Sequence, residues 1–176
     1  TDIYSLSLHD ALPILLPGAA SLFAAADVPL YPSAIAALGT NWTAVRASVS
    51  DNADGTTLNN ALLRVVAGGT VLARGMTDWR GEALVPVVGV PVTTWSEDEN
   101  AVVVSSIAAT VEVHFDPAVG SRTAAAEVRA GRQTAVRRLV DPAALEARRA
   151  SLPTTQQNVS LAARGALNLN LGLDLP

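Results

Sequence analysis

Residues 61–88 read ALLRVVAGGTVLARGMTDWRGEALVPVV, and this stretch decides the fold. It contains three short runs rich in Leu and Val, which are typical of β-strands. Gly68 and Gly69 separate the first two runs, and tight hairpin turns need residues that tolerate positive φ. Residues 77–81 separate the second run from the third with the turn formers Asp and Gly. The stretch therefore predicts a hairpin, a corner and a further strand.

Two more β-rich runs flank this stretch. Residues 42–49 alternate between apolar and polar side chains, which is the period of a half-buried strand. Residues 101–115 form a long run rich in Val, and it ends at Asp116 because Pro117 cannot continue a strand ladder. Short strands about ten residues apart, with turns between them, predict an all-β sandwich over residues 42–117.

The chain after this sandwich changes character. Residues 118–157 are rich in Arg and Ala. Within them we expect a short helix at 142–151, with Asp141 as its N-cap and Pro142 in its first turn. Residues 158–176 alternate again and predict a terminal strand. One face of that strand carries five leucines: Leu167, Leu169, Leu171, Leu173 and Leu175.

This leucine-faced strand cannot remain alone in water. It must add either to the sandwich of its own chain or to the sheet edge of another chain, and the sequence leaves both open. We therefore expect a protein partner, or self-association of the chain, through this strand.

The start of the chain contributes little to the fold. Residues 1–14, TDIYSLSLHDALPI, resemble a translated sequencing adapter, and we expect them to be an artefact. Residues 15–41 are expected to be an irregular lead-in or the remnant of a signal peptide. Their apolar run has about a dozen residues, fewer than the roughly 20 that a membrane span requires. We therefore expect no membrane span, and a secreted, surface or particle-associated location rather than a cytoplasmic one.

Composition excludes several classes of protein. The chain has 176 residues, a formal net charge of -4 and no Cys. The absence of Cys excludes a disulfide scaffold, and the negative charge disfavours a nucleic-acid partner. All 12 basic residues are Arg, so a phosphate-binding loop of the Gly-Lys-Ser/Thr type is excluded as well. Because 49% of the residues are hydrophobic, the chain is not a disordered polymer.

Catalytic chemistry has few candidates. His114 is the single His after residues 1–14, and Asp116 falls on the same strand face, so the two could form half of a dyad. No Gly-x-Ser-x-Gly elbow accompanies them, which disfavours a Ser-His-Asp hydrolase. The acidic stretches at 51–54 and 97–100 could offer oxygens to Ca²⁺ but are more typical of solvated loops. We expect no enzyme activity, no catalytic residue, no cofactor and no metal.

The three Trp residues, at 42, 79 and 95, allow two interpretations. Trp79 and Trp95 fall in a turn and a loop, where exposed indoles could stack on sugar rings. Scarce Trp residues more often close the ends of a small core, and we favour that interpretation. The pair Trp79 and Trp95 remains the alternative ligand platform.

The corner carries a resemblance to a known family. Residues 73–81, ARGMTDWRG, place Thr77, Asp78 and Gly81 in a T-D-x-x-G pattern. With the strands around it, the stretch 45–88 resembles a carboxypeptidase regulatory-like domain, a small sandwich of transthyretin-like (prealbumin-like), Ig-like form. The resemblance implies a non-catalytic module in which the three corner residues are structural.

Together these observations favour a non-enzymatic structural or protein-interaction module of a bacterial surface or phage-tail-like assembly. One alternative is a carbohydrate-binding accessory domain of a secreted protein that uses Trp79 and Trp95. A hydrolase is a further, disfavoured alternative, which predicts His114 in a pocket beside a nucleophile. The fold class we expect is an all-β sandwich, Ig-like or transthyretin-like, with a short C-terminal helix and a terminal strand.

Overall fold

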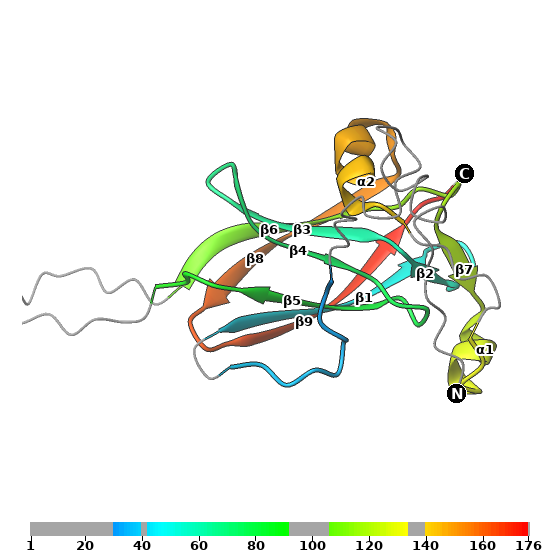
Figure 1. Cartoon of the computed structure of the whole chain (residues 1–176), viewed down its shortest axis with the longest axis horizontal. Helices are drawn as coiled ribbons and strands as arrows, with labels where there is room; N and C mark the ends of the chain where they lie inside the picture. Colours follow the sequence, from blue (N-terminus) through cyan, green and yellow to red (C-terminus); the bar gives the residue numbers. More distant parts are fainter. Residues whose placement is uncertain (1–29, 40–41, 92–105, 134–139, 176) are drawn as a thin grey trace, which may run out of the picture.

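Figure 1 shows a computed structural model of the chain, which describes residues 30–39, 42–91, 106–133 and 140–175. Within these residues nine strands form two facing sheets, and two short α-helices lie between the seventh and eighth strands. In chain order the elements are β1 (Thr43–Asp51), β2 (Thr57–Asn59), β3 (Leu62–Ala67), β4 (Thr70–Met76), β5 (Glu82–Val87), β6 (Ser106–His114), β7 (Ser121–Thr123), α1 (Ala125–Arg129), α2 (Pro142–Arg148), the 3-10 turn η2 (Arg149–Ser151), β8 (Thr154–Ala162) and β9 (Ala166–Leu173).

The two sheets are each organised around a central strand. In the first sheet β5 and β2 pair antiparallel with β1, β9 pairs parallel with β1, and β7 extends the sheet beyond β2. The second sheet has the order β4-β3-β6-β8 and is antiparallel throughout. We call these the β1 sheet and the β3 sheet.

Alternate residues of each strand point into the space between the sheets. Val45 and Val49 of β1 are 0% and 1% exposed, and Leu63 and Val65 of β3 are fully buried. These side chains belong to one apolar core that receives residues from both sheets. The predicted fold class is confirmed at the level of architecture: the chain is an all-β sandwich with a short C-terminal helix and a terminal strand.

The chain passes from the β3 sheet to the β1 sheet at residues 77–81, between β4 and β5. Thr77 is buried there, and its hydroxyl donates to the carbonyl oxygen of Leu58 at 2.6 Å. The same hydroxyl accepts the backbone N–H of Ala61 at 2.8 Å. A buried hydroxyl with both roles satisfied fixes the corner to the connection between β2 and β3.

Asp78 and Gly81 complete this corner. One carboxylate oxygen of Asp78 accepts the backbone N–H of Arg80 at 2.8 Å and that of Glu82 at 3.1 Å. Gly81 has a φ of +73°, which a residue with a side chain adopts only with strain. The positions that carry the T-D-x-x-G pattern are therefore the positions at which the chain turns between the sheets.

The leucines of β9 face the core of their own chain. Leu169, Leu171 and Leu173 are 6%, 5% and 1% exposed, and β9 pairs with β1 of the same chain. Of the two alternatives for the face from Leu167 to Leu175, addition to the sandwich of its own chain is therefore the one observed, and the expected protein partner or self-association through this strand stays a prediction. The apolar surface that would drive such a contact already lies inside the sandwich.

Other elements differ from the sequence-based prediction in extent. The sequence predicts one strand from residue 158 onward, whereas the structure has β8 followed by a turn and then β9. The short strand β7 was not predicted. The predicted helix at 142–151 is α2 continued by η2. No helix within the described ranges is long and apolar enough to cross a membrane.

We expect Gly81→Ala to lower the free energy of unfolding by about 3 kcal/mol. A Cβ at this position would lie 2.5 Å from the carbonyl oxygen of Val49, in addition to the strain of positive φ. Gly55→Ala is the matched control, because Gly55 also has positive φ but no atom within 4 Å of the added Cβ. That control should lose only about 1 kcal/mol. Urea unfolding measures both, and equal losses would contradict the role of close packing at Gly81.

Candidate functional site

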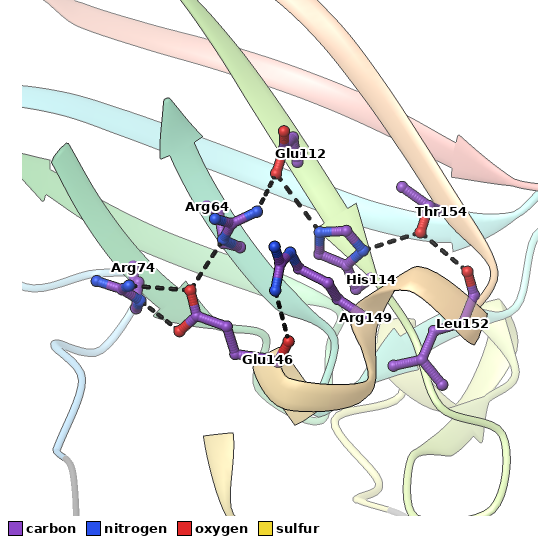
Figure 2. Close-up of polar contacts among 8 residues, drawn as sticks. All are labelled: Arg64, Arg74, Glu112, His114, Glu146, Arg149, Leu152 and Thr154. Carbon is purple, nitrogen blue, oxygen red and sulfur yellow. Dashed lines mark hydrogen bonds and ion pairs between the residues drawn. The ribbon is translucent and has the colours of Figure 1, made fainter. Parts of the chain in front are cut away.

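Five ionisable side chains gather on the outer face of the β3 sheet beneath α2 (Figure 2). They come from β3, β4, β6 and α2. We call them the charged cluster: Arg64, Arg74, Glu112, His114 and Glu146. Strand register explains three of the positions, because Arg64 is paired with Arg74 on one side and with Glu112 on the other. Residues opposite one another in register share a face of the sheet.

Arg64 lies at the centre of this cluster and is only 9% exposed. Its Nη1 is 2.5 Å from Oε2 of Glu112, and its Nε is 3.1 Å from Oε1 of Glu146. Glu146 also accepts two bonds from Arg74, at 2.6 and 2.9 Å. A buried guanidinium is costly unless it is paired, and here two carboxylates from different elements pair it.

The local sequence of α2 places Glu146 over the sheet. The side chain of Asp141 accepts the N–H of Ala143 at 2.9 Å, and Pro142 occupies the first turn, so the helix begins where the sequence predicts. Leu145 is fully buried, and α2 packs against β3. The bonds from the neighbouring Arg74 guanidinium lower the pKa of the Glu146 carboxyl, which therefore stays ionised near neutral pH.

His114 is buried at the edge of the charged cluster and 5% exposed. Its Nδ1 is 2.8 Å from Oγ1 of Thr154. Its Nε2 is 3.5 Å from Oε2 of Glu112 and has no hydrogen-bond partner within the described residues. Burial lowers the pKa of the imidazole, while the nearby Glu112 carboxylate opposes that shift. At neutral pH His114 is therefore a neutral, buried base.

His114 and Asp116 do not form the dyad that their spacing allows. Oδ2 of Asp116 is 2.6 Å from Nη2 of Arg148, and Oδ1 accepts the backbone N–H of Ala118 at 2.8 Å. The imidazole contacts Thr154 instead, a residue 40 positions further along the chain. Sequence reasoning missed this contact because β8 was not predicted to begin at that position beside β6.

The other candidate residues do not form a site. Trp79 is half-buried at the corner, and Trp42 is 44% exposed rather than closing the core. Trp95 and the acidic stretch 97–100 lie outside the described residues, so the platform of Trp79 and Trp95 stays a prediction. Among the residues that the structure describes, no group of three or more His, Cys, Asp or Glu could hold a metal ion.

A second polar region lies on the opposite side of the sandwich, as a groove of about 300 Å³ on the outer face of the β1 sheet. We call it the outer groove. Arg46 donates to the carbonyl oxygens of Ala34 and Ala36 and so holds the lead-in segment, residues 30–39, beside the groove. The side chains that give the groove its character are Ile35, Arg46, Ser48, Glu82, Asn168 and Asn170. Sequence reasoning missed this groove, because its residues come from four separate parts of the chain.

Comparisons with known proteins identify no family for this chain. No protein-family model matches the chain, and no curated protein matches it. A solved structure of Klebsiella pneumoniae 5-hydroxyisourate hydrolase is similar, with a TM-score of 0.34 and 12% sequence identity. The match covers 73% of this chain and 86% of that chain. At this level of similarity no activity passes from that protein to this one.

The comparison nevertheless corrects the functional prediction. The sequence favours a non-enzymatic structural or protein-interaction module, partly because the domains it resembles are non-catalytic. The solved structure found to be similar is a hydrolase, which contradicts that prediction. Function resides in sites placed on a fold, so the sandwich by itself assigns neither a structural nor an enzymatic role.

We expect the stability of the chain to fall as pH drops below about 6.5, the ordinary pKa of His. Because burial lowers the pKa of His114, the unfolded chain binds more protons than the native chain between that lowered pKa and the ordinary value. The free energy of unfolding therefore rises with pH through this window. The charges facing the imidazole are Glu112, Arg64 and Arg149.

Urea unfolding of the wild-type chain and of His114→Gln, from about pH 5 to about pH 8, measures this effect. The variant retains an amide that can bond Thr154 but cannot become protonated in this range. We expect its stability to change less with pH than that of the wild type. Parallel pH curves for the two proteins would show that His114 is not the group responsible.

Proposed function

We propose that this sandwich binds a small, uncharged, amide-bearing ligand in the outer groove. One observation carries the proposal: three polar side chains there, Ser48, Asn168 and Asn170, make no side-chain hydrogen bond within the described part of the chain. All three are exposed. Polar groups that converge on a concavity and lack partners are what a polar ligand requires.

The geometry of β9 supports an amide-bearing ligand. Asn168 and Asn170 are two residues apart on one strand, so they face the same side at a spacing of about 6.5–7 Å. A carboxamide both donates and accepts hydrogen bonds, and so does each amide group of a peptide-like ligand. A short extended ligand with amides at that spacing can therefore pair with both side chains.

The charges around the groove favour an uncharged ligand. Arg46 already donates to two backbone carbonyl oxygens, and Glu82 forms an ion pair with Arg80 at 2.9 Å. The Glu82 carboxylate is thus already paired with a cation, and both Nη atoms of Arg46 are bound by the chain itself. Ile35, which is 78% exposed, offers an apolar contact at the rim. The volume of about 300 Å³ lies at the small end of the range for small-molecule sites, which sets the size of the ligand.

At a finer level, we propose that the sandwich is related to carboxypeptidase regulatory-like domains. The support is the corner at residues 77–81, where Thr77, Asp78 and Gly81 each have a specific structural role. This corner combines a buried hydroxyl that both donates and accepts a hydrogen bond with a glycine at positive φ. It is therefore a more specific mark of a family than strand spacing alone.

We expect the double variant Asn168→Ala, Asn170→Ala to bind an N-acetylated dipeptide amide at least about tenfold more weakly than the wild type. Each substitution removes a carboxamide that has no other partner, so little stability is lost with it. NMR titration of the full chain measures the dissociation constant. The matched control is Asn158→Ala, an exposed Asn on β8 of the other sheet, and it should bind as tightly as the wild type.

Two results would count against this function. One is the absence of saturable binding of the dipeptide amide by the wild-type chain. The other is equal weakening in the β9 double variant and the β8 control. Tighter binding of acetate or inorganic phosphate than of the dipeptide amide would overturn the assignment to an uncharged ligand.

A further inference from the structure

We propose that Thr154 is a nucleophilic hydroxyl, activated by His114 and oriented through it by Glu112, that accepts acyl groups from small activated esters. This site lies on the β3 sheet and is independent of the outer groove. A weak hydroxyl nucleophile is activated when an imidazole lies beside it and a carboxylate lies beside the imidazole.

The three groups are placed by strand register. His114 on β6 is directly opposite Thr154 on β8, and Oγ1 of Thr154 is 2.8 Å from Nδ1 of the imidazole. On its other side the imidazole presents Nε2 to Glu112, 3.5 Å from Oε2 (Figure 2). Thr154 is exposed whereas His114 is buried, so the hydroxyl can be reached by a ligand while the base is shielded from water.

The carboxylate of Glu112 selects the tautomer that this chemistry needs. If the proton of neutral His114 were on Nδ1, the lone pair of Nε2 would face the carboxylate and be repelled by it. With the proton on Nε2, the N–H points toward the carboxylate and the lone pair of Nδ1 faces Thr154. The hydroxyl hydrogen then has two acceptors, Nδ1 at 2.8 Å and the carbonyl oxygen of Leu152 at 3.0 Å.

Glu112 is itself held in place by an ion pair. Its Oε2 is 2.5 Å from Nη1 of Arg64, which is in turn paired with Glu146 of α2. Glu112 therefore acts through His114 and is a positioning residue. Arg149 adds a positive charge near the imidazole, which disfavours its protonated form before reaction.

The reaction with p-nitrophenyl acetate balances as follows. Oγ1 of Thr154 attacks the carbonyl carbon, and the hydroxyl proton passes to Nδ1 of His114. The bond from the carbonyl carbon to the nitrophenolate oxygen breaks, and p-nitrophenolate leaves with that electron pair. Thr154 then carries an acetyl ester. His114 then loses its proton to solvent and takes one from a water molecule as that water attacks the acetyl carbon. The bond from this carbon to Oγ1 breaks, His114 returns the proton to Oγ1, and acetate leaves as its remaining proton passes to solvent.

The chain offers an internal control for this chemistry. Ser160 lies on the same face of β8 and is also exposed, but the residue opposite it is Ala108. Serine is the less hindered alcohol, so preferential acylation of Thr154 would show activation. The chain also has no Lys, which removes the commonest competing acyl acceptor.

The experiment treats the full chain with p-nitrophenyl acetate and locates the acetyl group by mass spectrometry. Cleavage after Arg149 and Arg164 releases Thr154 and Ser160 in one peptide, so fragmentation compares them directly. We expect acetyl on Thr154 in excess of Ser160. We expect Thr154→Ser to retain labelling, and His114→Gln to slow it at least about a hundredfold.

The Glu112→Gln variant tests the role of Glu112 through the pH dependence of labelling, which would not change if Glu112 were purely structural. The rate of labelling should rise with pH as His114 loses its proton. Because Glu112 raises the pKa of His114, the midpoint of this rise should move to lower pH in the variant. Circular dichroism establishes that each variant retains its strands.

Three results would overturn the proposal. They are equal labelling of Thr154 and Ser160, an unchanged rate in a folded His114→Gln variant, and a pH midpoint that does not move in Glu112→Gln. A positive result would also overturn the sequence-based prediction that the chain is not an enzyme, which otherwise stays a prediction.

Discussion

The burial of one guanidinium organises the outer face of the β3 sheet. Arg64 is on a central strand whose inward neighbours, Leu63 and Val65, fill the core, and α2 covers the opposite face. A charge in this position is tolerated only if carboxylates pair it. The pairing fixes Glu112 on β6 and Glu146 on α2. The second pair ties α2 to the outer face of the β3 sheet.

Local patterns in the sequence predict most of the strands, because alternation and turn residues act over a few positions. The hairpin at Gly68 and Gly69, the corner at residues 77–81 and the start of α2 at Asp141 all belong to this class. The first half of β8 is not predicted, because the sequence of the strand, TTQQNVSLA, is polar on its exposed face and only partly covered on the other. An edge strand needs few apolar side chains, so its pattern is weak.

The partners of a strand are harder to predict than the strand itself. The alternating leucines of β9 predict an extended segment with one apolar face, and that face is found. Period two says nothing about which strand lies alongside, and β9 pairs in parallel with β1, over a hundred residues earlier. The candidate sites depend on the same long-range information. His114 meets Thr154, and Ser48 meets Asn170, only through pairings between distant strands.

Both candidate sites lie on outer faces because side chains fill the space between the sheets. The lead-in segment 30–39 links these faces (Figure 1). At one end it carries Tyr31, whose pKa is raised by burial. The charge of Arg74 lowers this pKa, and the charge of Glu146 raises it. Further along, it is bound by Arg46 at the edge of the outer groove. This peripheral segment therefore runs near both the charged cluster and the outer groove.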